Sequence, residues 1–332
     1  MLNDKTILIT GGTGSFGKKF LEMVFQRYKP NKLIIYSRDE FKQSVMKTEF
    51  ANKLDMSRVR FFIGDVRDRE RLFRAFENVD YVIHAAAMKQ VPTCEYNPME
   101  AVKTNIHGAQ NVIDAALDRN VKRVIALSTD KAVNPINLYG GTKLVSDKLF
   151  IAANSYAGNK NTRFAVVRYG NVAGSRGSVI PVWKNMIEKG GSTLGVTDMR
   201  MTRFWITLEQ GVELVFKALE ESKGGETYIS KIPSFRVGDL AEAMLPGCNI
   251  EEIGIREGEK LHEVMVTRDD SQSTYEYEKH YIVYPHYDWA NLERDMLPGG
   301  TKVEDGFEYN SGTNKQWLSV EDLREALQCL SY

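Results

Sequence analysis

The sequence predicts an α/β protein built on a doubly wound parallel sheet, with a smaller and partly interwoven lobe toward the C-terminus. Three observations carry this prediction. Short apolar, β-branched runs alternate with amphipathic stretches over the first half of the chain. A glycine-rich turn joins the first apolar run to the first amphipathic stretch. The chain has 332 residues, more than one average domain needs, so a second lobe is expected.

The apolar runs have the length and composition of buried strands. They are Lys5–Thr10, Lys32–Tyr36, Val59–Ile63, Tyr81–His84, Lys122–Ser128 and Phe164–Tyr169. Between them, apolar residues recur at the spacing of helices, over Ser15–Arg27, Glu40–Leu54, Arg69–Glu77, Pro98–Arg119 and Leu138–Tyr156. Because each crossover between parallel strands needs a helix to return the chain, this alternation predicts the Rossmann architecture.

The pattern loosens after Tyr169. Loops rich in glycine and marked by proline follow, and helices are predicted at Leu208–Glu221 and Val320–Leu330. Tyr275–Trp289 is rich in Tyr, Glu and His without clean periodicity. We expect residues 1–170 to form the sheet domain, with return segments near 205–230, and residues 171–332 to form the second lobe, where irregular loops build a ligand site.

Composition excludes several classes of protein. Lys plus Arg and Asp plus Glu balance at 44 each, so no overall field attracts nucleic acid or an anionic membrane. The three cysteines, Cys94, Cys248 and Cys329, are widely spaced and form no C-x-x-C pair, which fits a reducing cytoplasm. The longest apolar stretches fall far short of the roughly 20 residues that a spanning helix needs. We expect a cytoplasmic chain that is neither exported nor embedded in a membrane.

A glycine-rich turn follows the first strand directly and opens the first helix. Its residues are Gly11, Gly12, Thr13, Gly14, Ser15, Phe16 and Gly17. Glycines at the first, fourth and seventh positions let the backbone turn tightly, approach a pyrophosphate and pack the helix on the strand. The helix N-terminus then offers unpaired N–H groups to the phosphates. The turn predicts a dinucleotide site; a purely structural turn is the alternative.

The end of the second strand favours NADP over NAD. In an NAD-binding fold of this kind, an acidic residue about 20 positions after the glycine turn binds the ribose 2′-hydroxyl. Here the strand ends in Ser37-Arg38, and a hydroxyl with a cation suits a 2′-phosphate, with Lys42 as a second cation. Asp39, next to Arg38, is an acidic residue that could bind the ribose 2′-hydroxyl, so NAD stays the alternative. Asp65, followed by Val66, is placed to accept from the adenine amine or else to cap the next helix.

Two groups of polar residues are predicted to meet at the carboxyl edge of the sheet. Ser128-Thr129-Asp130-Lys131 ends the fifth strand, and Tyr139 and Lys143 lie one turn apart at the start of the next helix. A nearby ammonium favours the phenolate and lowers the pKa of tyrosine from about 10 toward that of a general base. The pattern predicts oxidation of an alcohol with NADP. A surface salt bridge is the structural alternative for Asp130 and Lys131.

Together these motifs resemble the extended short-chain dehydrogenases/reductases, and among them the inverting UDP-N-acetylglucosamine 4,6-dehydratases. The resemblance covers Ile9–Gly17, Tyr36–Glu40, Ala85–Pro92, Leu127–Lys143, Arg168–Val179, Met201–Leu208 and Ile255–Val264. It implies a homo-oligomer that binds NADP and UDP-GlcNAc, with no nucleic acid or membrane partner. The implied product is UDP-2-acetamido-2,6-dideoxy-beta-L-arabino-hex-4-ulose, the first intermediate of the pseudaminic acid pathway.

The resemblance also implies a role for each catalytic residue. Tyr139 would deprotonate the 4-hydroxyl, and Thr129 would donate a hydrogen bond to the keto oxygen. Asp130 would be the acid for the departing 6-hydroxyl, and Lys131 the acid and base at carbon 5. Retaining 4,6-dehydratases carry Thr-Asp-Glu here, so the lysine is a departure. It serves as a base only with a depressed pKa, which desolvation and nearby cations can produce.

The remaining predicted site residues divide between cofactor and substrate. Cofactor contacts are expected from Gly11, Thr13, Gly14, Ser15, Phe16, Gly17, Ser37, Arg38, Lys42, Asp65, Val66, Ala85, Thr104, Tyr139 and Lys143. Substrate contacts are expected from Lys89, Asn171, Gly174, Ser175, Val179, Arg203, Arg256 and Glu259, with Arg168 and Arg176 as further candidate cations. Arg203 and Arg256 would hold the diphosphate, and Glu259 the ribose. His84 and His262 lack a partner pattern for metal, so both are interpreted as structural and no metal is expected.

Two other functions remain open on the sequence. A UDP-sugar 4-epimerase or reductase would use the same cofactor and tyrosine but has no need for Asp130 and Lys131. A non-catalytic NADP-sensing protein would use the fold without turnover, and the intact Tyr139 and Lys143 pair argues against it.

Overall fold

The computed structural model describes residues 1–175, 178–286 and 296–330. A ten-stranded sheet runs through it in the order β16-β14-β15-β10-β6-β5-β4-β1-β2-β3. Its parallel strands are β1 (Thr6–Thr10), β2 (Lys32–Ser37), β3 (Val59–Ile63), β4 (Tyr81–His84), β5 (Arg123–Thr129), β6 (Arg163–Tyr169) and β10 (Thr227–Ser230). The predicted Rossmann fold is confirmed. The strand order reverses between β1 and β4, where this architecture places its ligands.

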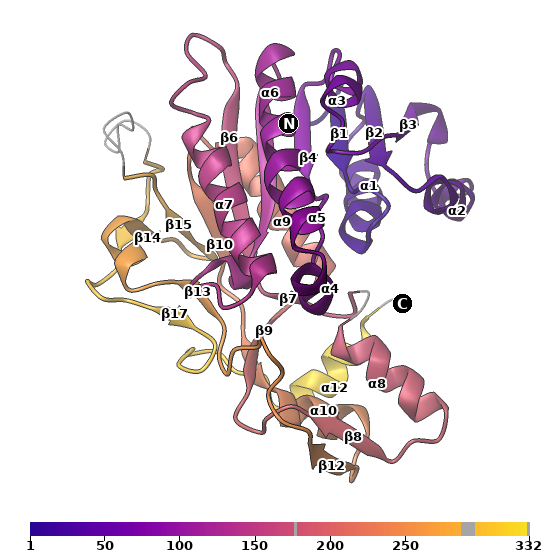
Figure 1. Ribbon diagram of the computed structural model, residues 1–332, viewed down its shortest axis with the longest axis vertical. Coiled ribbons are helices and arrows are strands. Elements are labelled where there is room, and N and C mark those ends of the chain that lie inside the picture. The colour runs from indigo at the N-terminus through magenta and orange to yellow at the C-terminus, as the bar shows by residue number, and fades with distance from the viewer. Residues whose placement is uncertain (176–177, 287–295, 331–332) are drawn as a thin grey trace.

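Helices cover both faces of the sheet because its strands are apolar on both sides. On β1, Ile9 packs into one apolar cluster with Phe20, and Leu8 packs into the other with Val112. The first cluster includes residues of α1 (Ser15–Arg27), α2 (Glu40–Phe50) and α9 (Leu208–Glu221). The second includes α3 (Arg69–Ala75), α6 (Gly108–Asp118) and α7 (Leu138–Ala152). Figure 1 shows α6 and α7 in front of the sheet.

The helix predicted over Pro98–Arg119 is not continuous. It divides into α5 (Pro98–Val102), a π-helix (Lys103–His107) and α6, and it is preceded by α4 (Val91–Tyr96), which was not predicted. The wide turn carries Asn105 inward, where its amide binds both backbone groups of Met88 at 2.8 and 2.9 Å. The same amide donates to the hydroxyl of Thr142. Asn105 therefore ties the loop after β4 to α7, an arrangement that apolar spacing does not reveal.

A second lobe lies at one end of the sheet (Figure 1). It contains α8 (Val179–Glu188), β8 (Thr193–Val196), α10 (Val237–Met244), β12 (Asn249–Glu252) and α12 (Val320–Gln328). Its apolar cluster includes Trp183, Trp205 and Leu240. A three-stranded sheet of β7 (Asn171–Val172), β9 (Thr202–Ile206) and β11 (Ser234–Arg236) adjoins this lobe.

The chain crosses back to the large sheet twice after residue 200. First α9 and β10 return, and then β14 (Thr274–Glu276), β15 (His280–Val283) and β16 (Thr301–Lys302) add an antiparallel edge. β15 and most of β14 fall inside Tyr275–Trp289, whose last three residues lie outside the described ones. β13 (Val264–Val266) pairs with β17 (Tyr309–Asn310) beside this edge. The domain boundary at residue 170 stays a prediction. Within the described ranges, no helix is long and apolar enough to cross a bilayer.

Candidate functional site

The first glycine turn has the backbone that a dinucleotide site requires. Gly11 has φ +66°, and a Cβ there would lie 2.9 Å from the carbonyl oxygen of Ala85. A Cβ on Gly17 would lie 2.1 Å from the carbonyl oxygen of Gly12. Any side chain at either position would push the turn away from β4 or the helix away from the turn. These glycines therefore let the N-terminus of α1 come close to the switch point.

That helix N-terminus carries no competing negative charge. Gly14 is the N-cap of α1 without a side-chain cap, and the first turn contains no acidic residue. The N–H groups of this turn therefore suit phosphate oxygens. Thr104, in the π-helix, is a further candidate for a cofactor contact, because its hydroxyl oxygen is buried and has no partner among the described residues.

The residues predicted to bind the 2′-phosphate lie at the end of β2. Arg38 is largely exposed, and its guanidinium lies 3.6 Å from a carboxylate oxygen of Asp65. The hydroxyl of Ser37 accepts from the Gln43 amide. Asp39 is occupied as the N-cap of α2 and as the ion-pair partner of Lys42 at 2.8 Å. The Asp39 carboxylate is therefore already bound twice, and each of the two candidate cations, Arg38 and Lys42, lies beside one carboxylate.

Asp65 does not cap the following helix, contrary to one of the two expectations. The N-cap of α3 is Asp68, which accepts from the Arg71 N–H. Asp65 instead forms an ion pair with Arg67 at 2.7 Å. Burial acts to raise the pKa of Asp65, but hydrogen bonds from the side chain and backbone of Arg67 outweigh burial, so the pKa is lowered. A carboxylate held in this way is a fixed acceptor beside Val66, as adenine recognition would need.

The start of α7 is held against the residues that end β5. Asn137 caps α7 by accepting from the Gly140 N–H at 2.7 Å, and its amide donates to the Gly258 carbonyl at 2.8 Å. A Cβ on Gly140 would lie 2.1 Å from the Lys131 carbonyl oxygen. The short 3₁₀ helix Asp130–Ala132 therefore rests directly on the first turn of α7. This contact, which the sequence interpretation did not identify, brings Tyr139 to Thr129.

Tyr139 faces the same cluster as Lys131, but its pKa differs from the expectation. Burial raises the pKa of Tyr139 to about 12, although the Lys131 ammonium and a hydrogen bond with Thr129 act to lower it. We expected Lys143 to lower this pKa. Burial also lowers the pKa of Lys143, and its nearest counter-charge is Asp147, one turn further along α7. The phenol is therefore neutral in the protein alone, and Lys131 is the cation that favours its ionisation.

Asp130, Lys131 and Glu263 form one buried charge cluster. The Lys131 ammonium donates to Asp130 at 3.1 Å and to Glu263 at 3.2 Å. The carboxylates are 1% and 2% exposed. Asp130 also accepts a hydrogen bond from the Thr129 hydroxyl at 2.9 Å. The Thr129 hydroxyl was expected to donate to the keto oxygen of the substrate, and in this structure it donates to Asp130 instead. The pair of Asp130 and Lys131 is not a surface salt bridge, because it lies inside the protein.

The pKa of Lys131 is raised, whereas a base at carbon 5 was expected to have a depressed one. Burial acts to lower it, but Asp130 and Glu263 together outweigh burial. The pKa of Asp130 is raised by burial and by the negative charge of Glu263. Asp130 is the larger cause of the rise, and Glu263, a second carboxylate that was not foreseen, adds to it.

Glu263 is the residue that sequence reasoning missed. It lies immediately before β13, within a segment that carried the family resemblance, but its spacing from Lys131 contains no motif. Its backbone is fixed on both sides by Ser311, whose hydroxyl accepts from the Glu263 N–H and whose N–H donates to the Glu263 carbonyl. Only the folded chain brings Glu263 to the end of β5.

The predicted substrate residues divide into two groups. Arg203 lies 3.7 Å from Glu263, and its guanidinium also donates to the carbonyls of Thr202 and Leu261. Burial lowers the pKa of Lys89, and the charge of Lys131 lowers it further. The other predicted substrate residues form a second, outer group.

The outer group is arranged along the second lobe. Arg256 is exposed, and a carboxylate oxygen of Glu259 is buried without a partner in the described part of the chain. Asn171 is exposed on β7, and Val179 is the first residue of α8. Between them, Gly174 has φ +68°, and the N–H of Ser175 donates to the Val172 carbonyl. Arg176 lies outside the described residues.

Arg168 is unsuited to a diphosphate in this structure. It is buried on β6, donates to the Met265 carbonyl at 2.8 Å and lies 3.9 Å from Asp147 and from Asp270. Asp147 in turn accepts from the Ser128 hydroxyl. Arg168 therefore belongs to an internal network behind Tyr139 and Lys143.

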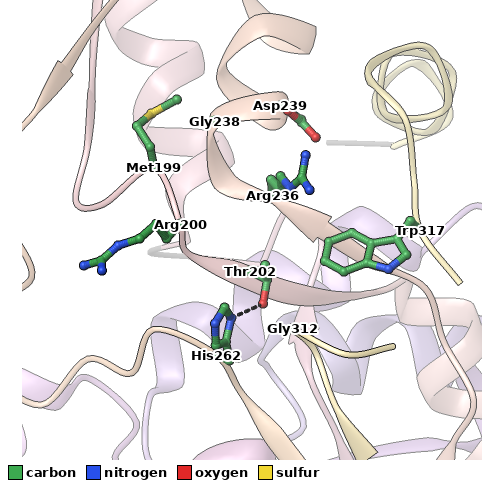
Figure 2. A pocket seen from close by; sticks show the side chains of 9 residues that line it. All are labelled: Met199, Arg200, Thr202, Arg236, Gly238, Asp239, His262, Gly312 and Trp317. Carbon is green, nitrogen blue, oxygen red and sulfur yellow. Dashed lines mark hydrogen bonds between the residues drawn. The ribbon is translucent and has the colours of Figure 1, made fainter. Parts of the chain in front are cut away.

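A cavity of about 520 Å³ lies across β9 from the charge cluster. Neighbouring strand residues point to opposite faces, so Thr202 lines this cavity while Arg203 faces Glu263. Figure 2 shows Thr202 bound to His262, with Arg236 near the Trp317 ring. The cavity contains no predicted catalytic residue. Its arginines are accompanied by Asp198 and Asp239, so it offers no excess of positive charge to a diphosphate.

Both histidines considered for metal binding have structural contacts. His84 is buried, packs against the Phe150 ring at an interplanar angle of 43° and bonds to the Thr10 hydroxyl at 2.9 Å, and burial lowers its pKa to about 3. His262 bonds to Thr202 at 2.8 Å. Across residues 1–175, 178–286 and 296–330, no group of three acidic, histidine or cysteine side chains is placed to hold a metal ion.

Known proteins match nearly the whole chain. The family described as "Polysaccharide biosynthesis protein" matches residues 7–285. A protein of Campylobacter jejuni named UDP-N-acetylglucosamine 4,6-dehydratase (inverting) is 56% identical over 332 residues, which cover 98% of each chain. The UDP-glucose 4-epimerase of Rickettsia canadensis is 40% identical, covering 100% of this chain and 98% of its own.

A solved structure agrees with both the sequence and the fold. The X-ray structure of Pen from Bacillus thuringiensis has a TM-score of 0.90 and 41% identity, and the match covers 99% of this chain and 98% of that one. The resemblance to inverting UDP-N-acetylglucosamine 4,6-dehydratases is thereby confirmed at the level of family. The chain belongs to the polysaccharide biosynthesis protein family, within the extended short-chain dehydrogenases/reductases.

Proposed function

We propose that the protein is a lyase, an inverting UDP-GlcNAc 4,6-dehydratase that uses NADP and forms UDP-2-acetamido-2,6-dideoxy-beta-L-arabino-hex-4-ulose. The observation that carries the proposal is the buried cluster of Asp130, Lys131 and Glu263 beside Tyr139. Elimination of water across carbons 5 and 6 needs an acid and a base in addition to the base at carbon 4, and this cluster supplies both kinds of group. The 56% identity to the Campylobacter enzyme of that name supports the same reaction.

The cofactor proposal rests on the fit of the glycine turn and the end of β2. Gly11 and Gly17 let the turn and the N-terminus of α1 pack closely, where a Cβ would collide with the backbone of Ala85 or of Gly12. Arg38 offers an exposed cation for a 2′-phosphate. Thr104 has a buried hydroxyl oxygen without a protein partner in the described residues. When bound, NADP would supply the acceptor for hydride from carbon 4 and the donor to carbon 6.

The chain's own residues handle the protons. Tyr139 takes the proton of the 4-hydroxyl as a phenolate, the form that the positive charge of Lys131 favours. The resulting ketone acidifies the proton on carbon 5. We assign the removal of this proton to Lys131. Lys131 is an ammonium, so it becomes a base only after it loses a proton. The Asp130 carboxylate, 3.1 Å away, is placed to accept that proton. That single transfer leaves an amine for carbon 5 and a carboxylic acid for the departing 6-hydroxyl.

The substrate would extend from this centre toward the second lobe. Lys89 and Arg203 lie at the inner end, and Arg256 and Glu259 lie in the loop that the Asn137 amide holds against α7 through Gly258. Asn171, Gly174, Ser175 and Val179 would line the path of the uridine and diphosphate. Guanidinium groups suit a diphosphate because they donate in pairs.

A UDP-sugar 4-epimerase is the second candidate, because the Rickettsia relative with that name is 40% identical. Incubation with UDP-GlcNAc in deuterium oxide, followed by NMR, separates the two. A dehydratase gives a 4-keto, 6-deoxy product with deuterium at carbon 5. UDP-GalNAc would contradict the proposal in favour of an epimerase, and no turnover would favour an NADP-sensing protein.

Arg38→Ala is expected to weaken NADP binding by about 10- to 100-fold and leave NAD binding unchanged, because a charge-assisted hydrogen bond is worth about 1.5–3 kcal/mol. Titration calorimetry with both cofactors measures this. Arg69→Ala is the matched control, since Arg69 is also exposed and lies 3.7 Å from one carboxylate, Asp114. Equal loss of NADP and NAD affinity in Arg38→Ala would contradict a role specific to the 2′-phosphate.

We further propose that the product enters a pseudaminic acid pathway, that the enzyme is a homo-oligomer and that it works in the cytoplasm. The pathway follows from the resemblance. The cytoplasm fits Cys94, Cys248 and Cys329, which are free thiols of the kind a reducing compartment maintains.

A further inference from the structure

The loop before β13 contains a tight turn that begins at Arg256 and ends at Glu259. The Glu259 N–H donates to the Arg256 carbonyl at 3.1 Å, and Gly258, the third residue of the turn, has φ +78°. A positive φ at this position favours glycine, as in a type II turn. Arg256 is exposed, and one carboxylate oxygen of Glu259 is buried without a partner in the described part of the chain. The turn therefore carries a cation at one end and an unsatisfied acceptor at the other.

Asn137 joins this turn to the helix that carries Tyr139. Its side-chain oxygen accepts from the Gly140 N–H at 2.7 Å and so caps α7, and its side-chain nitrogen donates to the Gly258 carbonyl at 2.8 Å. The two bonds use opposite ends of one amide, because an oxygen must face the N–H and an NH₂ group must face the carbonyl. A serine here would keep an oxygen for the cap but would lack the NH₂ group that reaches Gly258.

The turn packs closely against the start of this helix. A Cβ on Gly258 would lie 3.0 Å from the Cβ of Asn137 and 3.2 Å from a methyl carbon of Val91, on α4. Two residues after Gly258, the Lys260 ammonium donates to the carbonyl of Val133, the C-cap of the 3₁₀ helix that follows β5. The Lys260 contact keeps the loop attached when the Asn137 amide is removed. Loss of that amide therefore affects the turn rather than the whole loop.

We propose that Asn137 is a positioning residue, whose single amide holds the turn from Arg256 to Glu259 against the start of the helix that carries Tyr139. This inference rests on the proposed function, in which Arg256 and Glu259 hold the uridine diphosphate. The cap fixes the helix start, and the bond to Gly258 fixes the turn to the same side chain. Asn137 acts through these two elements, so its amide contributes to the affinity for the nucleotide end of the substrate.

Asn137→Ser tests the role, because serine is as good an N-cap as asparagine but has no NH₂ group. Titration calorimetry with UDP is expected to show binding about 10-fold weaker than in wild type, and KM for UDP-GlcNAc to rise by a similar factor, because the Gly258 carbonyl loses its donor. Since the cap is kept, kcat and bound NADP should stay within about twofold of wild type. Wild-type affinity for UDP in Asn137→Ser would overturn the inference.

Two further variants separate the two bonds of Asn137. Asn137→Ala loses the cap as well, so it should combine the weaker UDP binding with a lower kcat and a lower melting temperature. Gly258→Ala keeps the cap, but its Cβ would push the turn away from Asn137 and Val91, so it should weaken UDP binding with kcat little changed. The role is contradicted if Asn137→Ser loses as much kcat as Asn137→Ala, or if Gly258→Ala binds UDP as wild type does.

Asn154→Ser is the matched control. Asn154 lies just after the opposite end of α7, and its amide also bridges two segments, because it bonds to both backbone groups of Phe164 at 3.0 Å. It should leave UDP affinity and KM unchanged. If it weakened UDP binding as much as Asn137→Ser, the loss would be a general effect of destabilisation and the inference would fail.

Titration with UDP tests the role of Asn137 whether or not the sugar is dehydrated. Wild type that binds UDP but forms no 4-keto, 6-deoxy product refutes the dehydratase alone. An active wild type whose Asn137→Ser variant binds UDP equally well refutes only the positioning role. Wild type that does not bind UDP refutes both.

Discussion

Tyr139→Phe is expected to lower kcat with UDP-GlcNAc by about 10²- to 10⁴-fold, the usual contribution of a general base. The phenol is 9% exposed, bonds with Thr129 and is influenced by the Lys131 ammonium, so no solvent base can replace it easily. Removing only the hydroxyl preserves the apolar packing of the ring with Cys94 and Ala101. Steady-state assays by NMR, together with the amount of NADP that copurifies, measure the two effects separately.

Tyr228→Phe is the matched control for this change. Tyr228 is also fully buried, but it lies on β10 and its hydroxyl has no partner in the described part of the chain. Its loss should leave kcat within about twofold of wild type, since no hydrogen bond is broken. If Tyr139→Phe kept more than a tenth of wild-type activity, the proton at the 4-hydroxyl would have to be taken by another group.

Lys131→Met is expected to abolish deuterium exchange at carbon 5 and to lower product formation by about 10²- to 10⁴-fold, because the amine that contacts Asp130 is lost. It should also reduce stability, since Asp130 and Glu263 then face each other without their bridging cation. Breaking a buried ion pair costs about 3–5 kcal/mol, and partial exposure of Lys131 reduces that figure. NMR in deuterium oxide and thermal unfolding measure the two losses.

Lys131→Arg separates these two effects. A guanidinium keeps the positive charge between the carboxylates but does not lose a proton at accessible pH. We therefore expect near wild-type thermal stability and bound NADP, with exchange at carbon 5 still absent. Retained exchange in either variant would show that Lys131 is not the acid and base at carbon 5.

The sheet and the first half of the site could be predicted because their signals are local in sequence. Strands β3 and β4 have the predicted bounds, and β4 is buried at every position, as its apolar run predicts. The glycine turn and the pair of Tyr139 and Lys143 each occupy one short segment at an element boundary. Their positions at the sheet edge follow once the alternation of strands and helices is recognised.

The rest depends on contacts between distant segments. Glu263 reaches Lys131 from 132 residues away, and nothing in its neighbourhood marks it as a carboxylate of the catalytic cluster. Together with Asp130, it raises the pKa of Lys131 where a lowered pKa was expected. The π-helix likewise depends on where Asn105 finds its partners, and the strands β14 to β16 are too short and polar for their periodicity to be recognised.

The position of Glu263 in the last third of the chain matters for synthesis of the protein on the ribosome. The strands that carry the glycine turn and Lys131 emerge first, whereas Arg203, Lys260 and Glu263 all follow residue 200. A nascent chain released before β13 would hold Asp130 and Lys131 without the groups that balance them. The buried charge cluster is therefore complete only when about four-fifths of the chain has been synthesised.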